Sequence, residues 1–512
     1  MSSRGLPSFE IRSPSTTQGC APRTQWLMAF DNLADFLTVL GEDGELHRVR
    51  CEVDPRLELS AIVNLVCKQP GGGPAILFEQ VRGSRHPLLV NVLGSQKRLC
   101  RVLGVRSLLE LQETMKGLLH PQASEGWVQK LKQLSMPAGS VPWQPQVVKT
   151  AACQQVVKVG RDVDLLELPA VQCWPRDATP QLLGAQIFTR SSETGTRFVE
   201  TCPLEVRDRT TLGLHWNGTM EACRAFESHR ARNVPMPVAI SFGGDPLVSL
   251  LTTVPTPLRM DPLQFAGFLR GTSLELVRCR QLDMEVPAGA ELVIEGYLDP
   301  AEPEEPAATH SQRDGYYSVP RSMPLLRVSA VTHRGSPLMT GMISGQPPTE
   351  RTWRDLAAIQ LMLPWLRERF PELGEVHLPL AGAGVNYCFV SLKKAYPYHA
   401  VRMMHALWAE RLTMFTKFLV IVDDDVNVYD EDQVWGAIGA HVHPKRDLLF
   451  HDGPAAPEEH ASPQESLAGR VGIDATRKWK EEGHARPWPD RLVMPDEVWE
   501  LVNGRWGEYG FK

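Results

Sequence analysis

The segment ELVIEGYL, residues 291–298, is a short apolar strand candidate, and similar segments recur on both sides of it. Turn residues separate these segments, and one helical pattern, DPLQFAGFLRG at 261–271, interrupts them. The neighbouring candidates are LLGAQIFTRS (182–191), RTTLGLHW (209–216), MPVAISFGG (236–244) and LLRVSAVTHRG (325–335). Many short strands at this spacing are typical of a β-barrel or sandwich rather than of a parallel sheet.

The flanking parts of the chain alternate helical and strand patterns, which predicts an α/β domain on each side of the central β domain. We place the N-terminal α/β domain at residues 28–140, the β domain at 141–345 and the C-terminal α/β domain at 346–512. A chain of 512 residues exceeds one usual core, so several domains are expected. The first predicted helix lies in FDNLADFLTVL (30–40), with Asp31 as its N-cap.

Residues 1–27 are rich in Ser, Thr and Pro and lack the apolar region of a signal peptide. We expect them to form a disordered extension, and Met28, where the helical pattern begins, is a second candidate start.

Composition excludes several classes of protein. The formal net charge of −6 argues against a nucleic-acid binder, which would carry a basic stripe. No apolar run reaches the roughly 18 residues that suggest a membrane span. The ten cysteines are scattered without a C-x-x-C pair, so they indicate neither a zinc site nor a disulfide framework. A cytoplasmic protein is the natural interpretation.

Two segments hold acidic or imidazole side chains that suit a metal. FLVIVDDDVN (418–427) places Asp423, Asp424 and Asp425 at the end of a buried strand, where they either hold Mg²⁺ or face water in a turn. In HVHPKRD (441–447), His441 and His443 share one face if the segment is a strand, but two ligands do not make a metal site.

Two further segments are basic and suit an anionic ligand. They are KKAYPYHA (393–400), with Lys393, Lys394, Tyr396 and His399, and RVGIDATRKW (470–479), with Arg470, Arg477 and Lys478 near Gly472. The first is either an anion site or a solvated strand end. The second is a candidate phosphate cradle, because a glycine turn and flanking cations suit a phosphate.

A series of segments resembles the UbiD family of prenylated-FMN-dependent decarboxylases of aromatic and acrylic acids. The resemblance runs in order from about Met28 to the end of the chain. It is carried by QCWPRDATP (172–180), RDRTTLGLHW (207–216), GGDP (243–246), FAGFLRG (265–271), LELVRCRQLDMEVPAGAELVIEGYL (274–298), GYY (315–317), SGQPPTE (344–350), LKKAYPYHAVRMM (392–404), TKFLVIVDDDVNVYD (416–430) and VGIDATRKW (471–479).

This resemblance implies an α+β fold with an N-terminal α/β domain, a central split β-barrel like that of flavin reductases, and a C-terminal α/β domain. It implies a cytoplasmic homo-oligomer, either a dimer or a hexamer, in which we expect apolar helices such as VRMMHALWAERL (401–412) to contact another subunit. The implied cofactor is prenylated FMN, held through Mn²⁺ and K⁺ at its phosphate. The implied chemistry is reversible decarboxylation at an sp² carbon.

The residues at the family's site positions depart from its pattern. The metal-binding Asn and the substrate-binding Arg correspond to Phe198 and Pro203. Thr219 stands at the position of the metal-binding His, after the retained Trp216. Pro262, beside Asp261, stands at the position of the metal-binding Glu.

The acid loop before GYY departs in the same way, because its two carboxylate positions hold Ala307 and Gln312. A basic residue that contacts the flavin phosphate in the family corresponds to Arg470, so we predict that Arg470 binds a cofactor phosphate. We predict no metal ligands and assign no catalytic residue.

Two functions of different class remain open. The first is a UbiD-type carboxy-lyase that works with a rearranged site, using Glu200, Glu205, Asp261, Glu305 or His310. The second is a catalytically inactive homologue that acts as a structural or regulatory subunit, with a UbiD-like paralogue as a possible partner.

The loop LDPAEPEEPAATHSQRDGYY (298–317) bears directly on this choice. Its acidic half, with Glu302, Glu304 and Glu305 between prolines, suits an extended and solvated chain. We therefore expect the loop to be exposed and catalytically silent, with His310 as its best remaining proton donor and Asp314 capping a turn.

Overall fold

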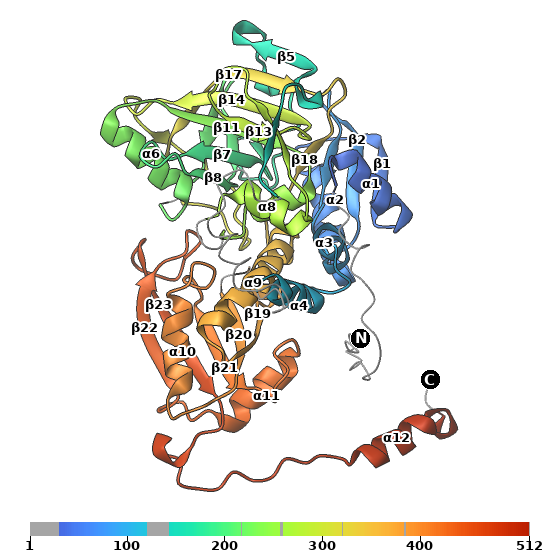
Figure 1. The fold of residues 1–512 in the computed structure, drawn as a ribbon, viewed down its shortest axis with the longest axis vertical. Helices are drawn as coiled ribbons and strands as arrows, with labels where there is room; N and C mark the ends of the chain where they lie inside the picture. The colour runs from blue at the N-terminus through green and yellow to red at the C-terminus, as the bar shows by residue number, and fades with distance from the viewer. Residues whose placement is uncertain are drawn as a thin grey trace, which may run out of the picture.

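The computed structural model describes residues 30–119, 143–216, 218–256, 260–319, 321–382, 384 and 386–510. The predicted extension at 1–27 and the alternative start at Met28 lie outside these residues. An antiparallel barrel lies at one end of the molecule and a five-stranded α/β domain at the other, with the N-terminal domain against the side of the barrel (Figure 1). The α+β fold class is therefore confirmed.

The N-terminal domain is built on a four-stranded mixed sheet in the order β1-β2-β3-β18. Its strands are β1 (Leu46–Val53), β2 (Ala75–Val81), β3 (Leu88–Val90) and β18 (Met339–Gly341), and its helices are α1 (Leu33–Glu42), α2 (Glu58–Cys67), α3 (Gln96–Leu103) and α4 (Leu108–Leu119). Because β18 pairs with β3 in parallel, the chain returns to this sheet after it has left the barrel.

The N-cap of α1 differs from the sequence prediction. The side chain of Asn32 accepts a hydrogen bond from the backbone N–H of Asp35, so Asn32 is the cap and the assignment to Asp31 was wrong. Asp31 instead forms an ion pair with Arg270 (2.7 Å), because an arginine from a distant helix reaches the start of this segment.

The central domain is a curled antiparallel sheet of nine strands that forms a half-barrel. Eight strands follow the order β6-β9-β10-β17-β14-β11-β7-β8, and β5 pairs with the far part of β17. The strands are β5 (Val156–Val159), β6 (Gln181–Leu182), β7 (Gln186–Arg190), β8 (Arg197–Glu200), β9 (Leu204–Val206), β10 (Thr211–Leu214), β11 (Met236–Phe242), β14 (Leu292–Leu298) and β17 (Leu325–His333). All five predicted central strand segments contribute to this sheet.

Among the described residues, three α-helices and two small sheets also belong to the central domain. The helices are α6 (Glu221–Arg232), α7 (Pro246–Leu251) and α8 (Pro262–Arg270). The small sheets are β13-β12-β4 (Glu285–Pro287, Glu275–Arg278, Gln146–Val148) and β15-β16 (Glu305–Pro306, Ser322–Met323).

The C-terminal domain begins with the long helix α9 (Glu350–Arg369). A five-stranded sheet follows, in the order β19-β20-β21-β23-β22, with β20, β21 and β23 parallel. Its strands are β19 (Leu373–His377), β20 (Tyr387–Leu392), β21 (Phe418–Asp423), β22 (Leu448–Pro454) and β23 (Leu467–Ala475), with helices α10 (His399–Trp408) and α11 (Glu431–His441). Buried side chains of α9 join those of the N-terminal and C-terminal domains in one continuous core, so α9 fixes how the parts sit.

The chain then leaves the body as an extended arm that ends in the helix α12 (Asp496–Gly504) and a turn of 3₁₀ helix (Trp506–Tyr509). The arm runs below the rest of the molecule and carries α12 away from it (Figure 1). Among the described residues, no helix has the length and apolar character needed to cross a bilayer.

A buried ion pair ties the start of the chain to the barrel helices. Arg270, at the end of α8, lies against Asp245, the N-cap of α7, and both side chains are 4% exposed. Arg270 also donates to the carbonyl of Phe30 (3.3 Å), just before α1. We expect Arg270→Met to lower the free energy of unfolding by about 3–5 kcal/mol, because it leaves the Asp245 carboxylate buried without a cation.

The matched control is Arg48→Met, since the Arg48–Glu79 pair is half exposed (49% and 35%). Its loss should be about 1 kcal/mol or less. Denaturation in urea compares the two variants, and equal losses would show that the buried pair has no special role.

Candidate functional site

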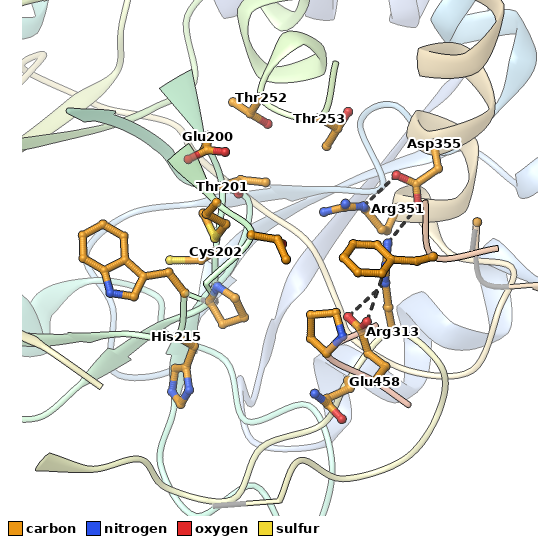
Figure 2. Close-up of a pocket in the computed structure, with 18 of the residues that line it drawn as sticks. Glu200, Thr201, Cys202, His215, Thr252, Thr253, Arg313, Arg351, Asp355 and Glu458 are labelled. Atoms are coloured by element: carbon orange, nitrogen blue, oxygen red, sulfur yellow. Dashed lines mark hydrogen bonds and ion pairs between the residues drawn. The ribbon is translucent and has the colours of Figure 1, made fainter. Parts of the chain in front are cut away.

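A cavity of about 970 Å³ lies between the barrel and the C-terminal domain. Glu200, Thr201, Cys202 and His215 lie on its barrel side in Figure 2, and Arg313, Asp355 and Glu458 lie across from them. Cavities of this size at domain boundaries are the usual sites of small organic ligands.

The six positions that the family resemblance singled out all line this one cavity. Phe198 lies on β8 and Pro203 follows it, Thr219 precedes α6, and Pro262 begins α8. Ala307 and Gln312 come from the loop between β15 and β16. Residues that lie far apart in the sequence are thus brought together at one cavity, and their correspondence to the family's site positions stays a prediction.

These side chains do not fit a manganese ion. Within the described ranges, no three His, Cys, Asp or Glu side chains are grouped so that they could hold a metal. Phenylalanine and proline have no donor atom for a divalent cation, and a threonine hydroxyl alone is a weak ligand. The residues present therefore do not fit a flavin phosphate that is held through Mn²⁺.

Arg313 connects two walls of the cavity. Its guanidinium donates to Asp355 on α9 (3.2 Å) and to Glu458 in the loop after β22 (3.0 Å). Arg351, one turn before Asp355 on α9, donates to the same carboxylate (3.0 Å). Burial acts to lower the pKa of Arg313, but Glu458 and Asp355 outweigh it and raise the pKa above its ordinary value. The group is thus a fixed cation that both carboxylates neutralise.

Two further arginines at the cavity are also paired. Arg411 donates to Glu200 (2.8 Å) and Glu221 (3.3 Å). Arg197 lies 3.2 Å from Asp261 and 2.8 Å from Glu285. The charges of Arg411 and Arg197 are therefore already paired with carboxylates of the chain.

The candidate donors of a rearranged site are divided between the cavity and its surroundings. Glu200 and His310 line the cavity, whereas Asp261 caps α8 and Glu305 is exposed on β15. Glu205 is fully buried behind the wall, where its carboxylate lies 3.1 Å from Nε2 of His215.

His310 is held in a neutral form. The centre of its ring lies 4.0 Å from that of His215, with the two ring planes tilted by 56°, and its Nδ1 lies 2.9 Å from the hydroxyl of Ser318. Burial, and then the neighbouring His215, lower the pKa of His310 to about 4. A neutral imidazole at pH 7 can accept a proton, but it is no efficient proton donor.

The expectation that the whole loop at 298–317 is exposed was wrong for its second half. Glu302 and Glu304 pair with Arg327 and Arg230 at the surface, as a solvated segment would. From Ala307 to Arg313 the loop turns inward and lines the cavity. The reason is the buried Asp177, whose carboxylate accepts from the N–H of Ser311 and pulls the chain in. Asp314 caps a turn as predicted, since it accepts from the N–H of Tyr316.

The acidic and imidazole candidates of the C-terminal domain serve its structure. Asp423 accepts from the guanidinium of Arg477 (2.9 Å), and Arg477 also lies 3.0 Å from Asp425. His441 ends α11 and His443 follows the helix, so the assumption of a shared strand face was wrong. Asp430 is the N-cap of this helix, α11.

The basic candidates are also largely neutralised. Lys394 pairs with the buried Glu482, and Lys478 pairs with Asp474 (3.0 Å). Arg470 lies on β23, where its guanidinium donates to the carbonyl of Pro454 (2.7 Å), and burial lowers its pKa. Arg470 is absent from the cavity wall, so its role in binding a phosphate stays a prediction.

Sequence reasoning missed Arg313, Asp355, Glu458 and Arg411. Single charged residues in separate helices and loops carry no local pattern, and only the fold brings them together. The one signal was the RDGYY segment, which the resemblance included only as GYY.

Three domain models cover most of the chain. They describe the N-terminal, Rift-related and C-terminal domains of 3-octaprenyl-4-hydroxybenzoate carboxy-lyase, and they match residues 37–118, 146–347 and 355–475. An uncharacterised protein of Aquifex aeolicus is 35% identical over 483 residues, which cover 94% of this chain and 99% of that protein. One of Archaeoglobus fulgidus is 34% identical over 485 residues, with the same coverage.

Solved structures with the same fold include two decarboxylase-type enzymes. The closed form of vanillic acid decarboxylase from Sedimentibacter hydroxybenzoicus has a TM-score of 0.80 at 25% identity, and covers 93% of this chain and 99% of that one. The UbiD-class enzyme HmfF from Pelotomaculum thermopropionicum, in complex with prFMN, has a TM-score of 0.74 at 26% identity, and covers 91% and 97%.

The low pKa of His310 predicts how stability depends on pH. The unfolded chain binds a proton on this histidine near pH 6.5, whereas the folded chain binds it only near pH 4. The free energy of unfolding should therefore fall as the pH drops from about 6.5 to 4. His310→Asn should make this fall shallower in urea titrations, and the exposed His47→Asn should leave it as in the wild type. Equal slopes in all three proteins would contradict the buried neutral state of His310.

Proposed function

This chain belongs to the UbiD family, and from that premise we propose that it is a homologue without carboxy-lyase activity whose cavity serves as a binding site. The observation that carries the proposal is the set of side chains at the six family positions. Phe198, Pro203, Thr219, Pro262, Ala307 and Gln312 line the cavity where the resemblance implies metal ligands, a substrate-binding arginine and two acids.

Each replacement removes a requirement of the chemistry. Pro203 itself offers no guanidinium to a carboxylate substrate, and Arg197, the first residue of β8, is already paired with Asp261 and Glu285. Ala307 cannot exchange a proton, and the amide of Gln312 does not titrate. A protein of this kind acts as a structural or regulatory subunit, and a UbiD-like paralogue is the partner class we favour.

A second candidate is a carboxy-lyase with a rearranged site, and one observation favours it. His310, hydrogen-bonded to Ser318, lines the cavity, and its ring contacts that of His215, which is paired with the buried Glu205. An ordered imidazole beside a buried histidine–glutamate pair is an arrangement that can transfer protons. Prenylated FMN is the cofactor that would supply the electrophilic ring in this case.

The two functions differ in turnover. We expect the protein, co-expressed with a flavin prenyltransferase, to release no CO₂ above background from a panel of aromatic and acrylic acids. The same preparations of His310→Ala and Glu305→Gln are measured beside it. Turnover in the wild type that is lost in His310→Ala would establish the second candidate, and Glu305→Gln, on the exposed half of the loop, controls for the substitution itself.

We propose that the protein works in the cytoplasm. The nine cysteines of the described residues are all free, and most of them are buried. Free thiols persist where glutathione and thioredoxin keep them reduced.

We also propose that the chain is a homo-oligomer, with the C-terminal arm as its contact. The apolar side chains of α10 are already buried in its own domain, among them Met403, Met404 and Leu407. Large exposed apolar side chains lie on the arm instead, namely Leu492, Val493, Met494, Trp499, Leu501, Trp506 and Tyr509. Their number exceeds what single scattered surface residues explain.

The arm helix α12 has one apolar and one polar face. Val498, Trp499, Leu501 and Val502 lie on one side by their spacing, and Asp496, Glu497, Glu500 and Asn503 lie on the other. A nine-residue helix is marginal without a surface to support it. Its acidic polar face does not suit an anionic membrane, which attracts basic helices.

A second copy of the chain fits the arm. The same domain exposes Trp435 on α11 and Phe450 on the edge strand β22, at 51% and 76%. Both halves of an apolar contact therefore exist in one chain, and a twofold exchange of arms satisfies both copies at once.

Disruption of the apolar face tests this contact. We expect light scattering to show a dimer or larger species for the wild type, and a smaller species for Trp499→Asp combined with Leu501→Asp. Glu500→Gln, on the polar face of the same helix, should assemble like the wild type. A monomeric wild type at micromolar concentration would rule the arm contact out.

A further inference from the structure

The end of the cavity that would receive a cofactor phosphate is bounded by β8, α6 and α8. Phe198 and Pro262 line it, and the residues beside them, Arg197 and Asp261, form an ion pair at 3.2 Å. Thr219 lies just before α6, whose first turn is joined to Glu200 of β8. The wall at this end therefore combines apolar side chains with charged ones that are already paired.

The two helix N-termini at this end are already occupied by carboxylates of the chain. Glu200 accepts from the N–H groups of Glu221 (3.2 Å) and Ala222 (2.8 Å) at the start of α6. Asp261 accepts from the N–H groups of Leu263 (2.8 Å) and Gln264 (3.3 Å) at the start of α8. Free N–H groups at helix N-termini are common phosphate sites in proteins. Here the N-termini of α6 and α8 each already bind a carboxylate of the chain.

The nearby cations are closed as well. Arg411 binds Glu200 and Glu221, and Arg197 binds Asp261 and Glu285. A phosphate dianion placed here would meet at least as many carboxylates as guanidinium groups, and would have to displace one of them. Electrostatics at this end therefore disfavours a phosphate.

The rest of the cavity wall is apolar or neutral and able to form hydrogen bonds. Apolar contributions include Val199, Val254, Met323, Ile343 and Phe415. Thr201 and Thr256 add hydroxyl groups, and Oε1 of Gln312 is a buried acceptor without a hydrogen-bond partner in the described residues. Among the described arginines that line the cavity, Arg321 is the one without a carboxylate partner. The cavity wall can thus bind one anionic group of a ligand, at Arg321, and several neutral polar groups.

We propose that the cavity binds an uncharged or singly charged, largely apolar ring compound that carries hydroxyl or carbonyl groups and no phosphate. The inference rests on the proposed function, because it uses the same loss of metal ligands, but it makes a separate claim about charge. The closed helix N-termini and the paired arginines carry that claim.

Riboflavin and FMN form a matched pair of probes, since they differ only in the phosphate. 2-Naphthol and 2-naphthyl phosphate form a second pair with a smaller ring. We expect at least one neutral probe to bind in equilibrium titrations, and its phosphorylated partner to bind at least about tenfold more weakly. The proposal would be overturned if either phosphorylated probe bound more tightly than its neutral partner, or if neither neutral probe bound.

A charge-neutral variant sharpens the test. Glu200→Gln combined with Asp261→Asn removes the two capping charges while it keeps the shape of both side chains. We expect the affinity for FMN to rise severalfold and that for riboflavin to change little. Glu305→Gln, exposed and outside the cavity, should change neither. An equal response of both flavins in the double variant would contradict the role assigned to the two carboxylates.

These binding titrations, together with the turnover assay described above, separate this inference from the proposed function. If the protein turns over a carboxylic acid with prenylated FMN, the proposed function fails. If it does not, and yet binds FMN more tightly than riboflavin, only the inference about ligand charge fails.

Discussion

The guanidinium of Arg313 links parts of the molecule that are far apart in sequence. It leaves the loop between β15 and β16 and binds Asp355 on the long helix and Glu458 in the C-terminal domain. A partly buried cation must keep its carboxylate partners, since the loss of one leaves an uncompensated charge away from water. Arg313 thereby joins the barrel loop, the helix α9 and the loop after β22, and residues of all three segments line the cavity.

The walls of the cavity show which features of a site follow from the fold and which depend on single side chains. The backbone carries the six family positions to one place, although none of the six side chains is a carboxylate, an imidazole or a guanidinium. Packing of strands and helices depends on size and apolar character, and many side chains satisfy it. Metal binding and proton transfer depend on particular atoms at particular distances, and they are lost with a single substitution.

The ion pairs around the cavity have a second consequence. Glu200 and Asp261 cap helices and neutralise Arg411 and Arg197 at the same time. Side chains used in this way stabilise the folded protein, and they leave little free charge for a ligand. The charged groups around the cavity are therefore largely used to stabilise the fold.

The amino-acid sequence by itself determined the barrel strands and the α/β character of the two flanking parts, because strand and helix patterning are local signals. It did not determine that residues 307–313 turn inward, since this depends on the buried carboxylate of Asp177, 134 residues away from Ser311. Nor did it determine that Asn32 caps α1 in place of Asp31, because Arg270 draws Asp31 away. Only the tertiary structure decided these points, as each depends on a charged group that the fold brings from a distant part of the chain.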